Sequence, residues 1–106
     1  MTKTTKIKVV TICGSMKFVT EMPKIATLLE VQHGWCVIQP VYDIETAEAT
    51  QRGLQNIVNA HWEKIDISDA IYVVNIGGYI GSSTRNEINY ALSKGKEIIY
   101  HENAGG

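Results

Sequence analysis

Short apolar runs alternate along this chain with longer stretches in which apolar residues recur every three or four positions. The short runs are rich in Val and Ile, and they predict buried strands over residues 7–12, 35–38, 70–76 and 97–100. Helical periodicity fills the intervals between them. Strands joined by helices run parallel through right-handed crossovers. The order therefore predicts a small doubly wound α/β sheet of about four parallel strands, with helices on both faces.

The helices differ in how clearly the pattern marks them. The clearest covers residues 54–65, where the recurring positions are Leu54, Ile57, Val58, His61, Trp62 and Ile65. A first helix is expected over residues 16–32, but it contains a proline. Because a straight helix tolerates proline only in its first turn, either the helix kinks at Pro23 or it begins near Thr20. A third helix is expected from about residue 84 to residue 94.

In sheets of this kind, ligands bind outside the carboxyl ends of the strands, at the point where the strand order reverses. Three loops would meet there: residues 13–17, 39–45 and 77–85. Asp69 opens the third strand at the opposite end of the sheet, so it is interpreted as a structural turn or cap residue. The candidate site is therefore sought in the three loops and in the helix ends beside them.

Length and charge narrow the class of protein. The chain has 106 residues, enough for one domain spanning residues 1–106 with one modest core. Ten basic residues oppose eleven acidic ones, and no basic stripe marks a surface for a nucleic-acid polymer. No apolar run reaches the ~18 residues of a membrane span, and the first residues lack the pattern of a signal peptide. We therefore expect a cytoplasmic protein with no membrane partner.

The cysteines and histidines predict neither a disulfide nor a metal site. Cys13 and Cys36 lie inside apolar runs, and without an export signal both are expected to be reduced thiols. Two isolated cysteines and three scattered histidines show no metal-ligand spacing along the chain, so the expected metal content is none.

The first loop is a candidate for binding an anion. Amide N–H groups at a helix N-terminus attract negative charge, and Lys17 would add to this beside Gly14 and Ser15. The alternative is a tight turn in which Ser15 caps the following helix. The second loop offers Tyr42 and Asp43 as contacts to a base or a sugar, although an ordinary polar loop explains them at least as well.

The third loop carries the candidate nucleophile. Its glycines let the backbone approach a ligand closely, and Gly81 is followed directly by Ser82 and Ser83. Glu87 comes next in the helix, where the helix dipole keeps a carboxylate ionised, as a nucleophile requires. The competing interpretation, which the pattern alone favours, is a capping box in which Glu87 hydrogen-bonds to the Thr84 backbone.

His61 lies on the apolar face of the helix over residues 54–65. A single histidine in that position is more often a core residue with hydrogen-bonded ring nitrogens than a catalyst. It could instead border the cleft, where an imidazole is suited to proton transfer near neutral pH. Its neighbour Trp62 is interpreted as core.

Three segments of the chain resemble the nucleoside 2-deoxyribosyltransferase family, which includes the 2'-deoxynucleoside 5'-phosphate N-glycosidases. They are Cys13-Gly14-Ser15, residues 69–75 (DAIYVVN) and residues 83–96 (STRNEINYALSKGK). The resemblance covers nearly the whole chain, and its most specific part is the glycine-rich loop followed by Glu87 and an alanine-bearing helix. The segment at residues 77–81 (GGYIG) resembles sequences of a small branch of this superfamily.

The resemblance implies that Glu87 attacks the anomeric carbon of a 2-deoxyribose and releases the base. Water or a second base then resolves the glycosyl-enzyme with overall retention. The implied partner is a small nucleoside or nucleotide, and the implied chemistry needs no cofactor. The turn at Gly14 and Ser15 is similar to the loop that holds a 5'-phosphate in the hydrolases, and Lys17 falls near a basic residue of those enzymes.

Three positions depart from the family pattern. Thr11 stands where a tyrosine is frequent, His61 where an aspartate assists departure of the base, and Gly81 where a polar residue contacts the sugar. His61 is expected to act as acid/base in place of that aspartate. The departures keep open a second function, a module that binds a nucleotide or nucleotide derivative without cleaving it. A third, a purely structural interaction domain, needs only the capping-box and core interpretations.

The short chain also bears on assembly. Four strands and three helices leave little sequence for a lid over the site. A small core and an incomplete pocket wall both favour self-association, so we expect a homodimer or a larger homo-oligomer in which a neighbouring copy closes the cleft.

Overall fold

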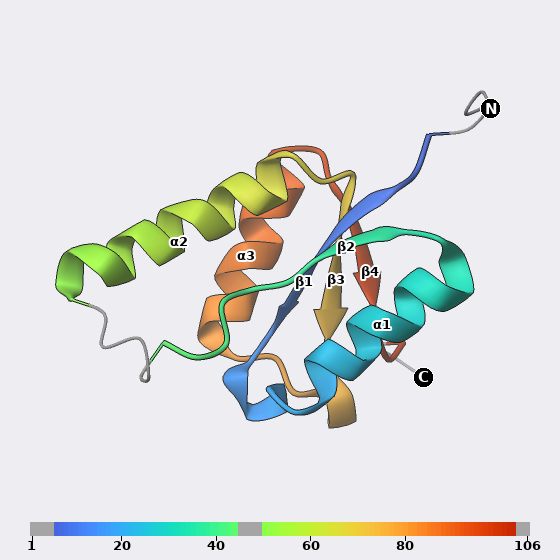
Figure 1. Ribbon diagram of the computed structural model, residues 1–106, viewed down its shortest axis with the longest axis horizontal. Coiled ribbons are helices and arrows are strands. Elements are labelled where there is room, and N and C mark those ends of the chain that lie inside the picture. Colours follow the sequence, from blue (N-terminus) through green and yellow to red (C-terminus); the bar gives the residue numbers. More distant parts are fainter. Residues whose placement is uncertain (1–5, 45–49, 104–106) are drawn as a thin grey trace.

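The computed structural model describes residues 6–44 and 50–103 (Figure 1). Its strands are β1 (Val9–Gly14), β2 (Cys36–Ile38), β3 (Ala70–Val74) and β4 (Glu97–Tyr100). Its α-helices are α1 (Glu21–His33), α2 (Gln51–Asp66) and α3 (Ser82–Ser93). Short 3-10 helices, η1 (Met16–Phe18) and η2 (Ile76–Gly78), follow β1 and β3. The order of strands and helices predicted from the sequence is confirmed.

The four strands form one parallel sheet in the order β2-β1-β3-β4. The register of the central pair places Cys13 beside Val73 and Gly14 beside Val74. From β1 the chain moves outward to β2 and then returns across β1 to β3, so the strand order reverses between β1 and β3. This is the Rossmann-like α/β fold that the sequence predicts, and its switch point lies at the carboxyl ends of these two strands.

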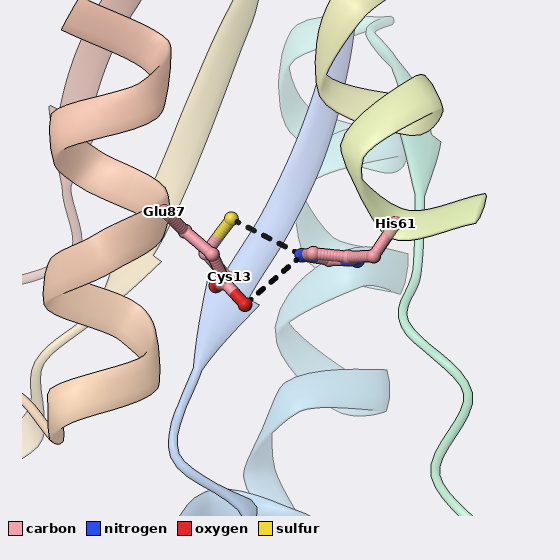
Figure 2. A group of neighbouring side chains, drawn as sticks. All are labelled: Cys13, His61 and Glu87. Carbon is pink, nitrogen blue, oxygen red and sulfur yellow. Dashed lines mark hydrogen bonds and ion pairs between the residues drawn. The ribbon is translucent and has the colours of Figure 1, made fainter. Parts of the chain in front are cut away.

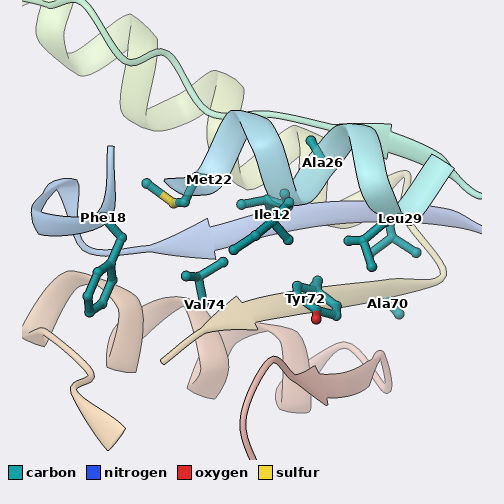
Figure 3. Packing of buried hydrophobic residues seen from close by; sticks show 10 residues of the cluster. Ile12, Phe18, Met22, Ala26, Leu29, Ala70, Tyr72 and Val74 are labelled. Atoms are coloured by element: carbon teal, nitrogen blue, oxygen red, sulfur yellow. The ribbon is translucent and has the colours of Figure 1, made fainter. Parts of the chain in front are cut away.

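One face of the sheet carries a continuous apolar core beneath α1 (Figure 3). Alternate side chains of a strand point to opposite faces, and here Ile12 of β1 and Val74 of β3 point toward α1. They pack with Met22 and Leu29 of the helix, while Phe18 of η1 belongs to the same cluster. All five side chains are buried, so this face is closed to solvent along the length of the helix.

The opposite face is covered by α2 and α3 (Figure 1). Ile71 and Val73 of β3 pack there against Ile65 of α2 and Ile88 of α3. Cys13 of β1 belongs to this second cluster and lies at its edge, where polar side chains replace apolar ones. The second core is therefore interrupted toward the carboxyl ends of the strands.

The start of α1 decides between the two interpretations of Pro23. The helix begins at Glu21 with Thr20 as N-cap, so Pro23 is its third residue and lies in the first turn. Proline costs no hydrogen bond in that turn, because the first amide groups of a helix have no partner within it. Residues 16–18 form η1 instead of an α-helical extension, so the expected start at residue 16 is wrong and the start near Thr20 is confirmed.

The third strand is shorter than predicted. It ends at Val74, and the side chain of Asn75 exchanges two hydrogen bonds with the backbone of Glu102, of 2.8 and 2.9 Å. Gly77 and Gly78 then adopt positive φ angles of 65° and 81°, which an extended strand does not allow. The strand was predicted to continue to residue 76 because Ile76 is apolar. Ile76 instead packs against the first core without belonging to the sheet.

Asp69 has the structural role that its position predicts. Its carboxylate accepts a hydrogen bond of 2.8 Å from the Val9 amide and a second bond from Lys6, at the end of the sheet opposite the switch point. Within the described residues, no helix has the length and apolar character required to cross a membrane. Glu45, the last residue of the predicted second loop, lies outside the described residues.

Candidate functional site

Glu87 lies on α3, and the position of the helix start rules out its role in a capping box. α3 begins at Ser82 with Gly81 as N-cap, two residues before the predicted start. Thr84 is therefore inside the first turn, with a residue exposure of 2 %, and it cannot act as the cap of this helix. Glu87 falls in the second turn, where its side chain is free to turn toward β1 and α2 (Figure 2).

His61 of α2 meets Glu87 across the carboxyl end of β1. Its Nε2 atom lies 3.4 Å from Oε2 of Glu87, and the two side chains are only 14 % and 18 % exposed. Figure 2 shows the imidazole pointing from α2 toward the carboxylate on α3. The histidine is thus neither a fully buried core residue nor a surface residue, and the partner that it meets is the predicted nucleophile.

Cys13 completes this cluster, and the sequence did not single it out as a site residue. Its Sγ atom lies 3.8 Å from Nε2 of His61. Burial raises the pKa of the thiol well above its ordinary value, and the charge of Glu87 and a hydrogen bond to that carboxylate raise it further. The thiol therefore stays protonated beside Glu87. Strand alternation could have indicated which face of the sheet Cys13 lies on. It shares that face with Thr11, opposite to Ile12.

The cluster opens on a pocket of about 310 Å³ between β1, α2 and α3. Cys13, His61 and Glu87 all line it. The remaining wall is mostly apolar, and it includes Met16, Pro40, Val41, Ile57, Val58 and Trp62. Trp62, interpreted as core from the sequence, also packs against Tyr90 of α3, with ring centroids 4.5 Å apart and the ring planes tilted by 45°. Trp62 therefore contributes both to the second core and to the pocket wall.

A second pocket of about 300 Å³ adjoins the first and is more polar. Its wall is formed by the turn after β1 and the N-terminus of α3, with Gly14, Ser15, Met16, Tyr79, Gly81, Ser82, Ser83, Thr84 and Glu87. Glu87 belongs to both pockets, together with Gly14, Met16 and Ser83. The carboxylate therefore stands at the junction of an apolar compartment and a compartment bordered by a helix N-terminus.

The turn after β1 also has a structural role. Ser15 caps η1, accepting a hydrogen bond of 3.1 Å from the Lys17 amide, so the capping interpretation is confirmed for this residue. A Cβ atom on Gly14 would lie 2.9 Å from Sδ of Met22 and 3.2 Å from Cβ of Val74. Close packing between β1, β3 and α1 therefore explains this glycine without any ligand.

Other predicted binding residues lie outside these walls. Lys17 holds its ammonium group 4.4 Å from the ring of Tyr79, which lines the second pocket. Tyr42 packs against the first core and donates a hydrogen bond of 2.8 Å to Gln39. Neither Tyr42 nor Asp43 is among the described residues that line the two pockets. The first and third loops thus meet at one edge, and the second contributes Pro40 and Val41.

Thr11 lies away from the pockets. It is fully buried, and its hydroxyl contacts the Lys64 carbonyl and the Ser68 hydroxyl at the C-terminal end of α2. Thr11 therefore contributes to the packing of α2 on the sheet.

No model of a protein family matches the chain, and no curated protein matches it either. The chain has a small α/β fold, with a four-stranded parallel sheet and three helices packed around it. The resemblance stated from the sequence remains a prediction about family.

Proposed function

We propose that the protein cleaves or transfers the N-glycosidic bond of a (deoxy)nucleoside or nucleotide, with Glu87 as nucleophile and retention of configuration. The observation that carries the proposal is the position of one carboxylate. Glu87 stands where an apolar pocket meets a polar one, and a histidine lies 3.4 Å away. A nucleoside has the matching division, with an apolar ring system on one side of its anomeric carbon and hydroxyl or phosphate groups on the other.

The two pockets suggest how such a substrate would lie. The base would occupy the apolar pocket, against Pro40, Val41 and Trp62. The sugar would then lie over Glu87, with its 5' end toward the second pocket. Free amide groups at the N-terminus of α3 favour an anion there, so a 5'-phosphate would be attracted to the backbone around Ser82 and Ser83.

The reaction would be a double displacement. A carboxylate oxygen of Glu87 forms a bond to the anomeric carbon, and the bond from that carbon to the base nitrogen breaks with its electron pair leaving on the base. A proton must reach the base as it departs. In the second step water or another base attacks the same carbon from the opposite side, and Glu87 is released as a carboxylate, which gives net retention.

His61 would supply the proton. In retaining glycosidases the acid and the nucleophile stand about 5–5.5 Å apart, with the scissile bond between them. Here Nε2 of His61 and Oε2 of Glu87 are 3.4 Å apart, so the imidazole must turn away from the carboxylate when a sugar enters. In the free protein this contact would instead hold the Glu87 carboxylate in place.

The resemblance to the nucleoside 2-deoxyribosyltransferase family supports this proposal. Glu87 matches the nucleophile of that family, and the turn at Gly14 and Ser15 is similar to its phosphate loop. The structure removes the main competing interpretation of Glu87, because the capping box does not form. The chemistry uses only side chains and a water or second base, so no cofactor is proposed.

The test is release of free base from a panel of nucleosides, deoxynucleosides and their 5'-monophosphates, followed by chromatography. Glu87→Gln should abolish release from the active substrate, while Glu63→Gln, the same change at an exposed position of α2, should leave the rate unchanged. A glycosyl adduct on a peptide containing Glu87, detected by mass spectrometry after rapid quenching, would identify the nucleophile. Full activity of Glu87→Gln would contradict the assignment.

A second candidate function is binding without cleavage, and the direct contact between His61 and Glu87 favours it. A histidine that stays on the carboxylate would neutralise it and block attack. In that case calorimetry should show tight binding of one nucleotide or nucleotide derivative, with the ligand recovered intact after long incubation. Rapid base release would exclude this function.

We also propose that a second copy of the chain closes the apolar pocket. Leu54 and Val58 lie on the apolar face of α2, yet they are 39 % and 45 % exposed at and beyond the pocket rim. The exposed side chains of Met16 and Val41 continue this surface. A face of this kind on a protruding helix can pair with its own copy about a two-fold axis.

Sedimentation would test this assembly. The wild-type protein should sediment as a dimer or larger species, and Val58→Asp should dissociate it and lower base release. Val31→Asp is the matched control, because Val31 is exposed on α1, away from the pockets. A monomer that retains full activity would contradict closure by a neighbouring copy.

A further inference from the structure

Three side chains with metal-binding atoms converge in the candidate site. Sγ of Cys13, Nε2 of His61 and a carboxylate oxygen of Glu87 all lie within 4.8 Å of one another. They come from β1, α2 and α3, so only the packing of these elements brings them together (Figure 2). Residues with ligand spacing along the chain are absent from the sequence, which is why linear spacing predicted no metal site.

The distances in this cluster are close to those of a zinc site. With Zn–S bonds of about 2.3 Å and Zn–N and Zn–O bonds of about 2.0–2.1 Å, a tetrahedral ion separates its sulfur and nitrogen ligands by about 3.6 Å and its nitrogen and oxygen ligands by about 3.4 Å. In the structure, Cys13 Sγ and His61 Nε2 are 3.8 Å apart, and His61 Nε2 and Glu87 Oε2 are 3.4 Å apart. These two separations match tetrahedral coordination to within a few tenths of an ångström, and a carboxylate oxygen of Glu87 lies within 4.8 Å of Cys13 Sγ.

The charges of the cluster favour a cation as well. A buried thiol faces a carboxylate, and the negative charge of Glu87 opposes ionisation of the thiol. A divalent cation removes this conflict, since one thiolate and one carboxylate neutralise it. On binding, the S–H bond of Cys13 breaks, an S–metal bond forms, and one proton is released to solvent.

The donor atoms select among cations. Calcium and magnesium take oxygen ligands, whereas one sulfur, one nitrogen and one oxygen suit zinc. Three protein ligands leave one position of a tetrahedron open. Because all three residues line the larger pocket, that position would be reached from it.

We propose that Cys13, His61 and Glu87 form a site for a thiophilic divalent cation, with zinc as the first candidate. The site stands independently of any glycosidic activity. One consequence rests on the proposed function: a bound cation occupies the Glu87 carboxylate and the His61 imidazole, so zinc inhibits base release.

Cobalt(II) is the probe, because its spectrum reports the ligands directly. Titration of the full chain under reducing conditions should reach one cobalt per chain. The expected signature is a near-ultraviolet charge-transfer band from a thiolate, with visible bands of four-coordinate cobalt. Zinc should displace the cobalt and abolish both, and about one proton per chain should be released on binding.

Variants assign the ligands. Cys13→Ser should remove the charge-transfer band, and Glu87→Gln should weaken zinc binding by more than about 100-fold, since loss of an outer-shell partner alone costs 10–100-fold. Cys36→Ser and His33→Ala are matched controls, because Cys36 and His33 are exposed and lie outside the cluster. Both should bind cobalt as the wild type does. Circular dichroism confirms that each variant is folded.

Two results would overturn the site: no thiolate band in the folded wild-type protein, or a band that survives Cys13→Ser and disappears in Cys36→Ser. The inhibitory consequence is measured separately, as base release with zinc and after a chelator removes it. If no substrate releases a base, the proposed activity fails while the cobalt spectrum still decides the metal site.

Discussion

The two faces of the sheet are built from the same strands and have different uses. Ile12 and Cys13 are neighbours on β1 and both are buried, yet they point in opposite directions. Ile12 enters a continuous apolar core under α1. Cys13 lies at the end of a shorter core under α2 and α3, where it meets His61 and Glu87.

This difference follows from where each helix lies along the sheet. α1 covers its face with a row of buried apolar side chains, including Met22, Ala26 and Leu29. α2 packs closely only at its C-terminal end, through Ile65, while Leu54 is 39 % exposed at its other end. The pocket occupies the space that α2 leaves open. The larger apolar cluster thus lies on one face, and the polar cluster lies on the other.

The largest expected effect comes from removing the imidazole on the α2 side. His61→Ala should lower base release by about 10²–10⁴-fold, because it removes the proton donor to the leaving base. Steady-state kinetics on the best substrate provides the measurement. His33→Ala on α1 is the control. An equal loss of base release in that variant would contradict the assignment of catalysis to the face under α2 and α3.

The next effect tests the α1 side. Ile12→Ala should lower the free energy of unfolding by about 2–5 kcal/mol, because it opens a cavity in the continuous core. Ile67→Ala, at a side chain that is 59 % exposed, should change it by less than about 0.5 kcal/mol. Urea denaturation followed by circular dichroism measures both. If Ile12→Ala unfolds with the stability of the wild type, the core under α1 is not the main source of stability.

A smaller effect is expected at Gly14, where β1 packs closely against α1 and β3. Gly14→Ala should cost about 1–3 kcal/mol, because its Cβ would press on Met22 and Val74. At Gly81 an added Cβ would meet nothing closer than 3.7 Å, so Gly81→Ala should cost less than about 1 kcal/mol. Thermal melts compare the two variants. Equal melting temperatures would mean that β1 and α1 are less tightly packed than the contacts indicate.

The smallest effect concerns Asp69, at the end of the sheet away from the site. Hydrogen bonds from the Val9 amide and from Lys6 lower the pKa of its carboxyl below the ordinary value of 3.8. A lowered pKa in the folded state means a stabilisation that is present above that ordinary value and is lost as the pH falls through the folded-state pKa. Asp69→Asn should therefore melt below the wild type at neutral pH.

That difference in melting temperature should shrink as the pH is lowered below about 4, where the wild-type carboxyl also becomes protonated. Glu63→Gln controls for removal of a negative charge from the surface. A difference that stays constant across this range would show that the charge of Asp69 does not matter to the turn.

Much of the fold could be predicted from the sequence, because its elements follow from local patterns. Runs of β-branched residues marked all four strands, and apolar periodicity marked all three helices. Pro23 restricted the start of α1 to one of two places, and the strand–helix order required parallel pairing. These features depend on side chains a few positions apart, whose preferences hold before any tertiary contact forms.

The tertiary structure alone decided the site. The contact between Cys13 and His61 joins residues 48 positions apart, and it exists only because β1, α2 and α3 pack in this arrangement. α3 begins at Ser82, two residues before Thr84, so Thr84 is buried in the first turn and Glu87 has no capping role. A sequence pattern records which residues share a helix face or a strand face. The distances between atoms on different elements depend on crossovers and packing, and these set the chemistry that the three side chains can perform together.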